Sequence, residues 1–521
     1  MKRKDGTIKN EFRGLRNVGE SDIVKCKEGG RCMIVEKEKK VGRKAIPEAE
    51  KKIGCKIYLT KEQQEDIENY GVGASFSERC ANLISLEIEK QKEEEADTVK
   101  IIDLFAGLGG IRLGFEQGLK KQGLHAKCVF TSEIKKYAIK AYQNYFGNEK
   151  IYGDITQIKT KDIPDFDVLL AGFPCQPFSS AGKGLGFSDT RGTLFFEIER
   201  ILKEKKEIGK PAKAFLLENV EGLVNHDNGN TLNVIIAKLK GLGYKVNYKV
   251  LDSQYFGLAQ SRKRIYIVGT LNEKVDLENF EKSTATFSDI MERGLPTIES
   301  TFTKKLFNNY SPDEIVGKSI KDKRGGKDNI HSWDIDLKGK TTKQQRDLLN
   351  ALLCERRKKK WAKEIGIEWM DGMPLTVEQI ETFYNNKNLK TMLDDLVKKG
   401  YLKYEHPKKL EDGQRKPDTS KPKGYNIVSG KLSFEFSKIL SPNEMVPTLV
   451  AMDVSKLGVV DNGGLRKLSI REGQRLCGYN PDEYDLSILK ESEAFDLLGN
   501  TVCVPVIAAI SERVAMALKR A

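Results

Sequence analysis

The chain has 521 residues, of which 39% are hydrophobic and 31% charged, and its formal net charge is +14. This length and composition exclude collagen and a disordered chain. The chain is long enough to form several hydrophobic cores without disulfide bonds or metal ions to stabilise them. The nine cysteines form no CxxC pair and the four histidines show no ligand spacing, so we expect no metal site and a reducing compartment.

Residues 1–98 are predicted to form an N-terminal extension. The basic start lacks the apolar stretch of a secretory signal, and no run of about 18 apolar residues occurs anywhere, so we expect a cytoplasmic protein without membrane association. A strand at 56–60, helices at 61–71 and 75–91, and a charged linker at 91–97 follow. The pattern over 56–91 resembles a ribbon-helix-helix DNA-binding or regulatory module. A structural appendage or a dimer contact is the alternative.

Residues 99–282 alternate between apolar strands and helices, with strands predicted at 99–107, 127–133, 167–172, 214–220, 244–253 and 264–270. This alternation predicts an α/β fold with a doubly wound, mostly parallel sheet. Residues 283–465 do not continue this alternation of strands and helices, and they are predicted to be an inserted α+β domain. Residues 466–521 again have the composition of a globular domain, and they are predicted to complete the domain that begins at residue 99.

The inserted segment is basic, which suggests a polyanionic partner. Residues 375–407 predict two helices and a strand, with a return strand at 425–428, which resembles a winged helix. The five cations Arg356–Lys360 are predicted to lie on a helix, where two or three would face DNA phosphates. A solvated helix face that only aids solubility is the alternative.

Two polar motifs follow the first two strands. In DLFAGLGG (103–110), Gly107 and Gly109 would let backbone approach a ligand at a helix N-terminus. Glu133, at the end of the next strand, is placed to accept hydrogen bonds from ribose hydroxyls. The glycine loop departs from GxGxxG, which argues against NAD.

Three further motifs are expected at the same sheet edge. Cys175 follows Pro174 in GFPCQPFSSAGKG, and we interpret it as a nucleophile, although a lone cysteine is often a buried small hydrophobe. Glu218 ends the strand of LLENVEG as a candidate proton donor or hydrogen-bond acceptor. Gln260, Arg262 and Arg264 are spaced by two, so that on a strand they would share one face, either solvated or in contact with an anion or base.

These motifs appear in the order DLFAGLGG, TSE, GDIT, GFPCQPFS, ENV, QSRKR, RKLSIREGQRLCGY and GNTVCVPV. In this order they resemble the DNA (cytosine-5)-methyltransferase family of the bacterial restriction-modification type. The resemblance covers 99–282 and 466–521. It implies a Rossmann-like S-adenosylmethionine-dependent methyltransferase domain, with a target recognition domain at 283–465, in which Thr448–Leu449 resembles a short signature. Ile470 stands where the family usually has proline.

The resemblance also implies residue roles. Cys175 attacks carbon 6 of a flipped-out cytosine, Glu218 contacts ring nitrogen 3, and Arg262 helps to hold the base, with Arg264 beside it as a further catalytic residue. The loop 176–190 matches a mobile catalytic loop. The implied S-adenosylmethionine-binding residues are Phe105, Gly107, Gly109, Glu133, Asp154, Ile155, Pro174, Asn500 and Val502.

The implied activity is methylation of carbon 5 of cytosine at a specific site in double-stranded DNA, through a covalent cysteine adduct. The implied functional partner is a restriction endonuclease, from which the enzyme would protect host DNA. A tRNA cytosine methyltransferase shares the core motifs, but its recognition region is small. A catalytically inactive DNA-binding regulator is a third interpretation, against which Cys175, Glu218 and Arg262 are all present.

Overall fold

The computed structural model describes residues 23–27, 31–35, 56–174, 194–323, 329–411, 414–428 and 434–520. The chain divides into two compact units, Met1–Thr98 and Val99–Ala521. Cys175 therefore lies outside the described residues, and so does the whole of the predicted catalytic loop at 176–190.

The first unit contains a three-stranded antiparallel sheet of β1 (Ile23–Lys27), β2 (Arg31–Val35) and β3 (Lys56–Tyr58), followed by α1 (Lys61–Tyr70) and α2 (Phe76–Ala96). Thr60 begins α1 through a capping box with Gln63. The predicted strand and two helices are present, and the predicted strand corresponds to β3, which pairs with β2 in this three-stranded sheet. The charged linker predicted at 91–97 is wrong, because α2 continues to Ala96; nothing between the acidic residues breaks a helix.

The second unit is built on a seven-stranded sheet in the order β6-β5-β4-β7-β8-β10-β9. The strands are β4 (Thr98–Leu104), β5 (His125–Ser132), β6 (Ile151–Tyr152), β7 (Val168–Gly172), β8 (Ala214–Val220), β9 (Lys245–Asp252) and β10 (Lys263–Thr270). The β4–β7, β7–β8 and β5–β6 pairs are parallel, whereas β10 is antiparallel to both β8 and β9. The predicted α/β class with a mainly parallel sheet is confirmed.

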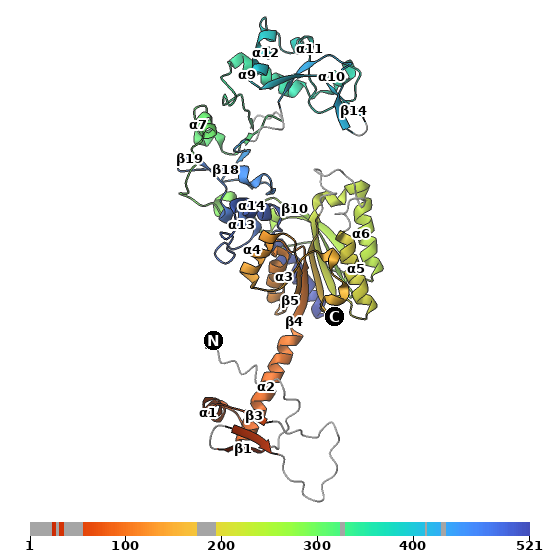
Figure 1. Ribbon diagram of the computed structural model, residues 1–521, viewed down its shortest axis with the longest axis vertical. Coiled ribbons are helices and arrows are strands. Elements are labelled where there is room, and N and C mark those ends of the chain that lie inside the picture. Colours follow the sequence, from red (N-terminus) through yellow and green to blue (C-terminus); the bar gives the residue numbers. More distant parts are fainter. Residues whose placement is uncertain are drawn as a thin grey trace, which may run out of the picture. The chain divides into compact units, whose positions relative to one another are not determined.

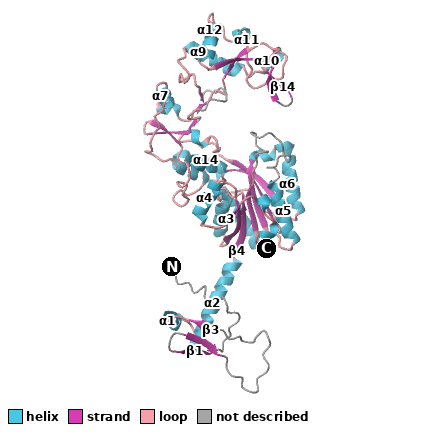
Figure 2. Ribbon diagram, in the orientation of Figure 1, coloured by secondary structure: helices cyan, strands magenta, loops and turns pink. Residues whose placement is uncertain are grey.

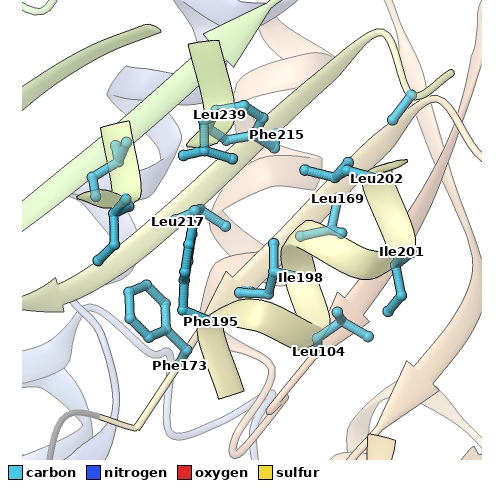
Figure 3. Close-up of a cluster of buried hydrophobic side chains, with 14 of the residues drawn as sticks. Leu104, Leu169, Phe173, Phe195, Ile198, Ile201, Leu202, Phe215, Leu217 and Leu239 are labelled. Carbon is cyan, nitrogen blue, oxygen red and sulfur yellow. The ribbon is translucent and has the colours of Figure 1, made fainter. Parts of the chain in front are cut away.

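Helices cover both faces of this sheet (Figures 1 and 2). On one face, α5 (Leu194–Glu207) and α6 (Asn230–Gly241) pack their apolar sides on the strands, as Figure 3 shows for Phe195, Ile198 and Leu239 against Leu169 and Leu217. On the other face, α3 (Gly110–Lys121) packs with α15 (Val504–Lys519), while α4 (Lys136–Phe146) belongs to a third core. Full burial of such side chains contributes roughly 1.5–3 kcal/mol each.

The predicted insert, 283–465, holds two cores of its own. One lies on a five-stranded sheet, β12-β11-β17-β18-β19, made by β11 (Ser319–Ile320), β12 (Asn329–Ile330), β17 (Lys438–Ile439), β18 (Leu457–Asp461) and β19 (Gly464–Lys467), with α7 (Thr301–Phe307) and α8 (Pro312–Ile315). β19 runs across the predicted boundary at 465. The other core belongs to residues 333–427.

Four helices and two small antiparallel sheets make up this second part of the insert, and the helices and the first of the two sheets form its core. They are α9 (Lys343–Glu355), α10 (Lys359–Glu364), α11 (Val377–Glu381), α12 (Leu389–Lys398), β13 (Leu402–Glu405) paired with β16 (Gly424–Ile427), and β14 (Lys408–Glu411) paired with β15 (Gln414–Pro417). The chain then returns to the sheet domain through α13 (Ile470–Cys477) and α14 (Glu491–Asn500), which pack with residues 440–459.

The basic run 356–360 does not lie on one helix. α9 ends at Glu355 and α10 begins at Lys359. Arg356 is only 3% exposed, and its guanidinium donates a 2.6 Å hydrogen bond to the Asn426 side chain. Burial lowers the pKa of Arg356 to about 10. The prediction that Arg356 faces solvent or phosphate is therefore wrong, because it fastens α9 to β16.

Among the described residues, no single helix is long and apolar enough to cross a membrane. The bent pair α14 and α15, at 41°, meets the length and composition criteria jointly, but the apolar side of α15 is buried against α3 and the sheet.

Candidate active site

The loop between β4 and α3 combines positive φ angles with close packing. Phe105 (φ 56°), Gly107 (φ 54°) and Gly109 (φ 68°) all adopt left-handed backbone. A Cβ on Gly109 would overlap the rings of Phe146 and Tyr142, so this glycine is required by the fold. A Cβ on Gly107 would meet nothing closer than 4.0 Å, so this turn leaves open space above the carboxyl end of the sheet.

Glu133 closes this loop from the neighbouring strand. Its carboxylate accepts 2.8 Å hydrogen bonds from the backbone N–H groups of Gly107, Ile134 and Lys135. The side chain is 8% exposed. Since a carboxylate has about four acceptor positions, Glu133 retains capacity for a ligand hydroxyl while its position is fixed.

Asp154 and Ile155 follow β6, the outermost strand on this side. The Asp154 carboxylate accepts 3.0 and 2.8 Å hydrogen bonds from the N–H and hydroxyl of Thr156, and it remains exposed at the start of a short 3₁₀ helix (Ile155–Gln157). Ile155 is 2% exposed and packs into the core of the sheet. The two residues therefore offer a polar group and an apolar anchor at one strand end.

The C-terminal motif returns to the β4 loop. A Cβ on Gly110 would lie 2.9 Å from Cγ2 of Val502, so the Val502 side chain packs directly on the start of α3. Asn500 is exposed and donates to the Asp496 backbone oxygen at 2.8 Å. Lys135 donates to the Asp496 carboxylate at 2.8 Å. The predicted cofactor residues from the beginning and the end of the domain thus meet around one loop.

Asp103 is a buried acid beneath this loop, to which the sequence motif alone assigned no role. It is 1% exposed and accepts a 3.3 Å hydrogen bond from Tyr142, whose hydroxyl in turn accepts from Arg112 at 3.0 Å. Burial raises the pKa of Asp103 to about 7, although Arg112 opposes the shift. The sequence signal that could have identified Asp103 is its position as the first residue of the DLFAGLGG motif.

Glu218 and Arg264 form the charged pair at the edge where Cys175 is expected. Their side chains are 3.1 Å apart, from Oε1 to Nε, and 11% and 14% exposed. Burial raises the pKa of Glu218, and Arg264 and Arg262 only partly offset this. A carboxyl group with a raised pKa next to a guanidinium is suited to share a proton with a ligand nitrogen while the guanidinium holds an oxygen.

Asn219 connects this pair to the strand that leads to Cys175. Its amide donates a 3.2 Å hydrogen bond to the Phe173 backbone oxygen. Glu218 lies opposite Gly172 in the parallel β7–β8 register. Pro174 is exposed at the end of this segment. The β7 end and the Glu218 carboxyl therefore occupy the same sheet edge.

Arg262 does not share the position of Arg264. β10 begins only at Lys263, so Gln260 and Arg262 precede the strand, and the predicted single strand face is wrong. Arg262 is 2% exposed and donates to the backbone oxygens of Leu449 (2.8 Å) and Gly499 (3.1 Å). The predicted solvated face is therefore wrong for this side chain.

Gln260 completes a seam with the Thr448–Leu449 segment. Its side-chain oxygen accepts from the Leu449 N–H at 2.9 Å, and its amide donates to the Leu476 backbone oxygen at 2.8 Å. The Thr448 hydroxyl donates to the Ser261 backbone oxygen at 2.7 Å. The residues resembling a recognition-domain signature thus dock on the QSRKR segment.

A doubly wound sheet with these two clusters defines a class. One cluster is an open glycine turn with fixed acids on the next two strands, which fits a nucleoside-containing cofactor at the carboxyl edge of the sheet. The other is a buried carboxyl–guanidinium pair beside it. Together they describe a group-transfer enzyme of the Rossmann type.

The family model described as C-5 cytosine-specific DNA methylase matches residues 99–515, and the chain belongs to this family. Type II methyltransferase M.NlaIV of Neisseria lactamica is 59% identical over 422 residues, covering 80% of this chain and 98% of that protein. M.NgoBV of Neisseria gonorrhoeae is 58% identical over the same coverage. M.BanI of Aneurinibacillus aneurinilyticus is 42% identical over 80% of this chain and 95% of that protein.

The predicted enzyme class is therefore confirmed: the protein is a DNA (cytosine-5-)-methyltransferase that uses S-adenosylmethionine. The prediction of the restriction-modification type agrees with these relatives, which are Type II methyltransferases. The open turn at Gly107 and the fixed Glu133 carboxylate fit the cofactor, because a larger residue at 107 would occupy the space above the sheet.

Proposed function

We propose that Cys175, Glu218 and Arg264 carry the methylation chemistry on a cytosine turned out of a specific duplex site. The supporting observation is the buried 3.1 Å pair of Glu218 and Arg264 at the sheet edge where β7 leads into Cys175. A flipped base is required, because carbons 5 and 6 are inaccessible inside the stack.

The reaction starts when the Cys175 thiolate forms a bond to carbon 6, which moves an electron pair toward ring nitrogen 3 and carbon 5. Glu218, whose pKa is raised by burial, gives its proton to nitrogen 3 and so neutralises the charge. Arg264 holds both the carboxylate left on Glu218 and the base carbonyl oxygen 2. We assign this base-holding role to Arg264 and a structural role to Arg262.

S-adenosylmethionine, when bound, supplies the methyl group that carbon 5 accepts. Loss of the carbon 5 proton to a base then restores the 5,6 double bond and releases the Cys175 thiolate. The proton on nitrogen 3 returns to the Glu218 carboxylate, which regenerates the acid. Phe105, Gly107 and Gly109 would face the methionine end of the cofactor, Glu133 the ribose, and Asp154 and Ile155 the adenine. Pro174, Asn500 and Val502 would complete the pocket.

We further propose that residues 283–465 recognise the DNA site, and that a restriction endonuclease is the functional partner in the cytoplasm. The relatives named Type II methyltransferases support this partnership. The size of residues 283–465, with two cores of their own, favours DNA over tRNA as substrate.

A trapping experiment tests the chemistry. Duplex DNA carrying 5-fluorocytosine at the methylated site should form a stable covalent complex, because the carbon 5 proton is absent. Cys175→Ser should abolish the adduct, whereas Cys354→Ser, at an exposed cysteine on α9, should leave it unchanged. Glu218→Gln should slow adduct formation, with Glu221→Gln as its exposed control. An adduct that persists in Cys175→Ser would overturn the assignment.

A further inference from the structure

Residues 342–428 form a module in which helices and strands alternate around one core. In chain order they comprise α9, the short α10, a bridge from Leu375 to Tyr425, α11, α12, β13, the β14–β15 hairpin and β16. Apolar residues from these helices and from β13 and β16 pack together. In Figure 1 the helices surround the short strands, and β14 lies at one end of the module. Two successive helices in contact, α11 and α12, are followed by strands and a β-hairpin, which is the element order of a winged helix-turn-helix.

The second helix of the pair, α12, has one apolar and one polar side. Leu389, Met392, Leu393 and Leu396 are buried in the core, whereas Lys390, Thr391, Asp394 and Lys398 are exposed. The residues just before the helix, Lys387 and Asn388, are also exposed. Asparagine and lysine side chains and the threonine methyl group match adenine, guanine and thymine edges in the major groove.

Hydrogen bonds within the module leave the first turn of α12 available. Asp394 accepts hydrogen bonds from Lys390 (3.0 Å) and Tyr425 (2.5 Å), so these charges are satisfied internally. Among the described residues, no carboxylate forms an ion pair with Lys387. The side chains that remain for a ligand are therefore Lys387, Asn388 and Thr391, at the N-terminal end of the helix.

The β14–β15 hairpin is exposed over nearly its whole surface. In β15 all four residues are exposed, and Leu410 of β14, 55% exposed, lies opposite Arg415. A two-stranded hairpin of this kind is marginally stable alone and adds nothing to the apolar core. Its basic residues include Lys409 and Arg415. Within the described part of the chain, Arg415 has no acidic partner, whereas Lys409 lies 4.0 Å from Glu411.

We propose that this module is a winged helix that binds the substrate DNA, with α12 reading bases in the major groove and the β14–β15 hairpin contacting phosphates. The assignment rests on the proposed role of residues 283–465 in DNA recognition and names the surface that performs it. Charge complementarity supports DNA as the occupant, because the described strands of the exposed hairpin carry four basic residues and one acid, and the start of α12 is polar. The cation run at 356–360 is excluded as the main contact, since Arg356 is buried and Lys358 pairs with Glu355.

The test uses the full-length enzyme and three alanine variants at exposed positions. The helix variant changes Lys387, Asn388 and Thr391; the hairpin variant changes Lys409 and Arg415; and the control changes Lys343, exposed at the start of α9. Fluorescence anisotropy would measure binding to the methylated site, identified by bisulfite sequencing, and to an unrelated duplex, from ~50 to ~200 mM salt. Thermal melting would verify that each variant is folded.

We expect the helix variant to bind the methylated site roughly 5- to 100-fold more weakly and the unrelated duplex with little change. The hairpin variant should weaken binding to both duplexes equally and lower the salt slope by about 0.9 for each phosphate that it no longer neutralises. Lys343→Ala should match the wild type. Wild-type affinity and site preference in both module variants would overturn the inference, as would binding of another protein at this surface without an effect on DNA. Failure of the unaltered enzyme to form the 5-fluorocytosine adduct would instead reject the proposed function.

Discussion

The two arginines of QSRKR should fail in different ways when each is changed to methionine. Arg262→Met removes two hydrogen bonds to the buried backbone oxygens of Leu449 and Gly499, at 2.8 and 3.1 Å. An unsatisfied buried acceptor costs about 1–3 kcal/mol, so the unfolding free energy should fall by about 2–5 kcal/mol. Among the described residues, the buried Nε atom of Arg262 has no hydrogen-bond partner. Because methionine removes this unpaired polar atom, the loss of stability should stay below the sum of the two largest penalties.

Arg264→Met should have the opposite profile. Burial lowers the pKa of the Arg264 guanidinium, so replacing it relieves a desolvation cost, and Glu218 can hold a proton in its absence. Stability should therefore change little. Turnover should fall about 10²-fold or more, the usual effect of removing one group that stabilises developing charge.

Urea unfolding, cofactor binding by calorimetry and single-turnover methylation would separate the two variants. Arg262→Met should show a lower urea midpoint, with activity recovered in proportion to the folded fraction. Arg264→Met should keep its midpoint and bind cofactor, but methylate slowly. A stable, inactive Arg262→Met together with an unstable Arg264→Met would refute the division of roles.

Three other alterations test the nucleophile, the buried acid and the first unit. Cys175→Ser should abolish methylation yet leave S-adenosylmethionine affinity within about twofold, and full turnover by this variant would contradict its role as nucleophile. Asp103→Asn should remove a pH dependence of stability. Because the folded pKa is raised from 3.8 to about 7, the folded wild type keeps a proton that the unfolded chain releases, and its stability falls by up to about 1.4 kcal/mol per unit as pH rises between these values. Urea midpoints of the wild type and of Asp103→Asn at pH 5.5 and 7.5 would measure how the stability of each protein changes with pH. An equal change with pH in both proteins would count against the raised pKa of Asp103. A fragment beginning at Val99 should methylate DNA, since M.NlaIV aligns over 98% of its own length with 80% of this chain; an inactive but folded fragment would give the first unit a catalytic role.

The sheet domain was largely predictable because its information is local. Apolar strands followed by glycine, acid or amide residues mark the carboxyl edge of a parallel sheet, and this rule located Glu133 and Glu218, whereas Asp154 was assigned from the resemblance of GDIT to a family motif. The 3.1 Å contact of Glu218 with Arg264 follows from the β8–β10 pairing, which no local pattern specifies.

The failures concern side chains whose surroundings come from distant segments. Arg262 and Arg264 look equivalent in sequence, and only the segments at Leu449 and Gly499 bury the first of them. Arg356 looks like part of a solvated ridge, but Asn426 lies 70 positions further along and accepts its hydrogen bond. Long-range pairing of this kind leaves no periodic signal, so neither the spacing around Arg262 nor the composition around Arg356 indicates that these side chains are buried.

The hydrogen bonds around Gln260 join the end of residues 283–465 to the segment that carries Arg264. The segment 260–264 holds the Thr448–Leu449 segment through Gln260, Ser261 and Arg262, and two residues later it carries Arg264 to Glu218. The end of residues 283–465 is therefore positioned against the same five residues that carry Arg264 to the charged pair. These contacts are mainly to backbone atoms, and apolar side chains from residues 440–459 add packing against α13 and α14. The position of the Thr448–Leu449 segment is therefore coupled to that of the segment that carries Arg264.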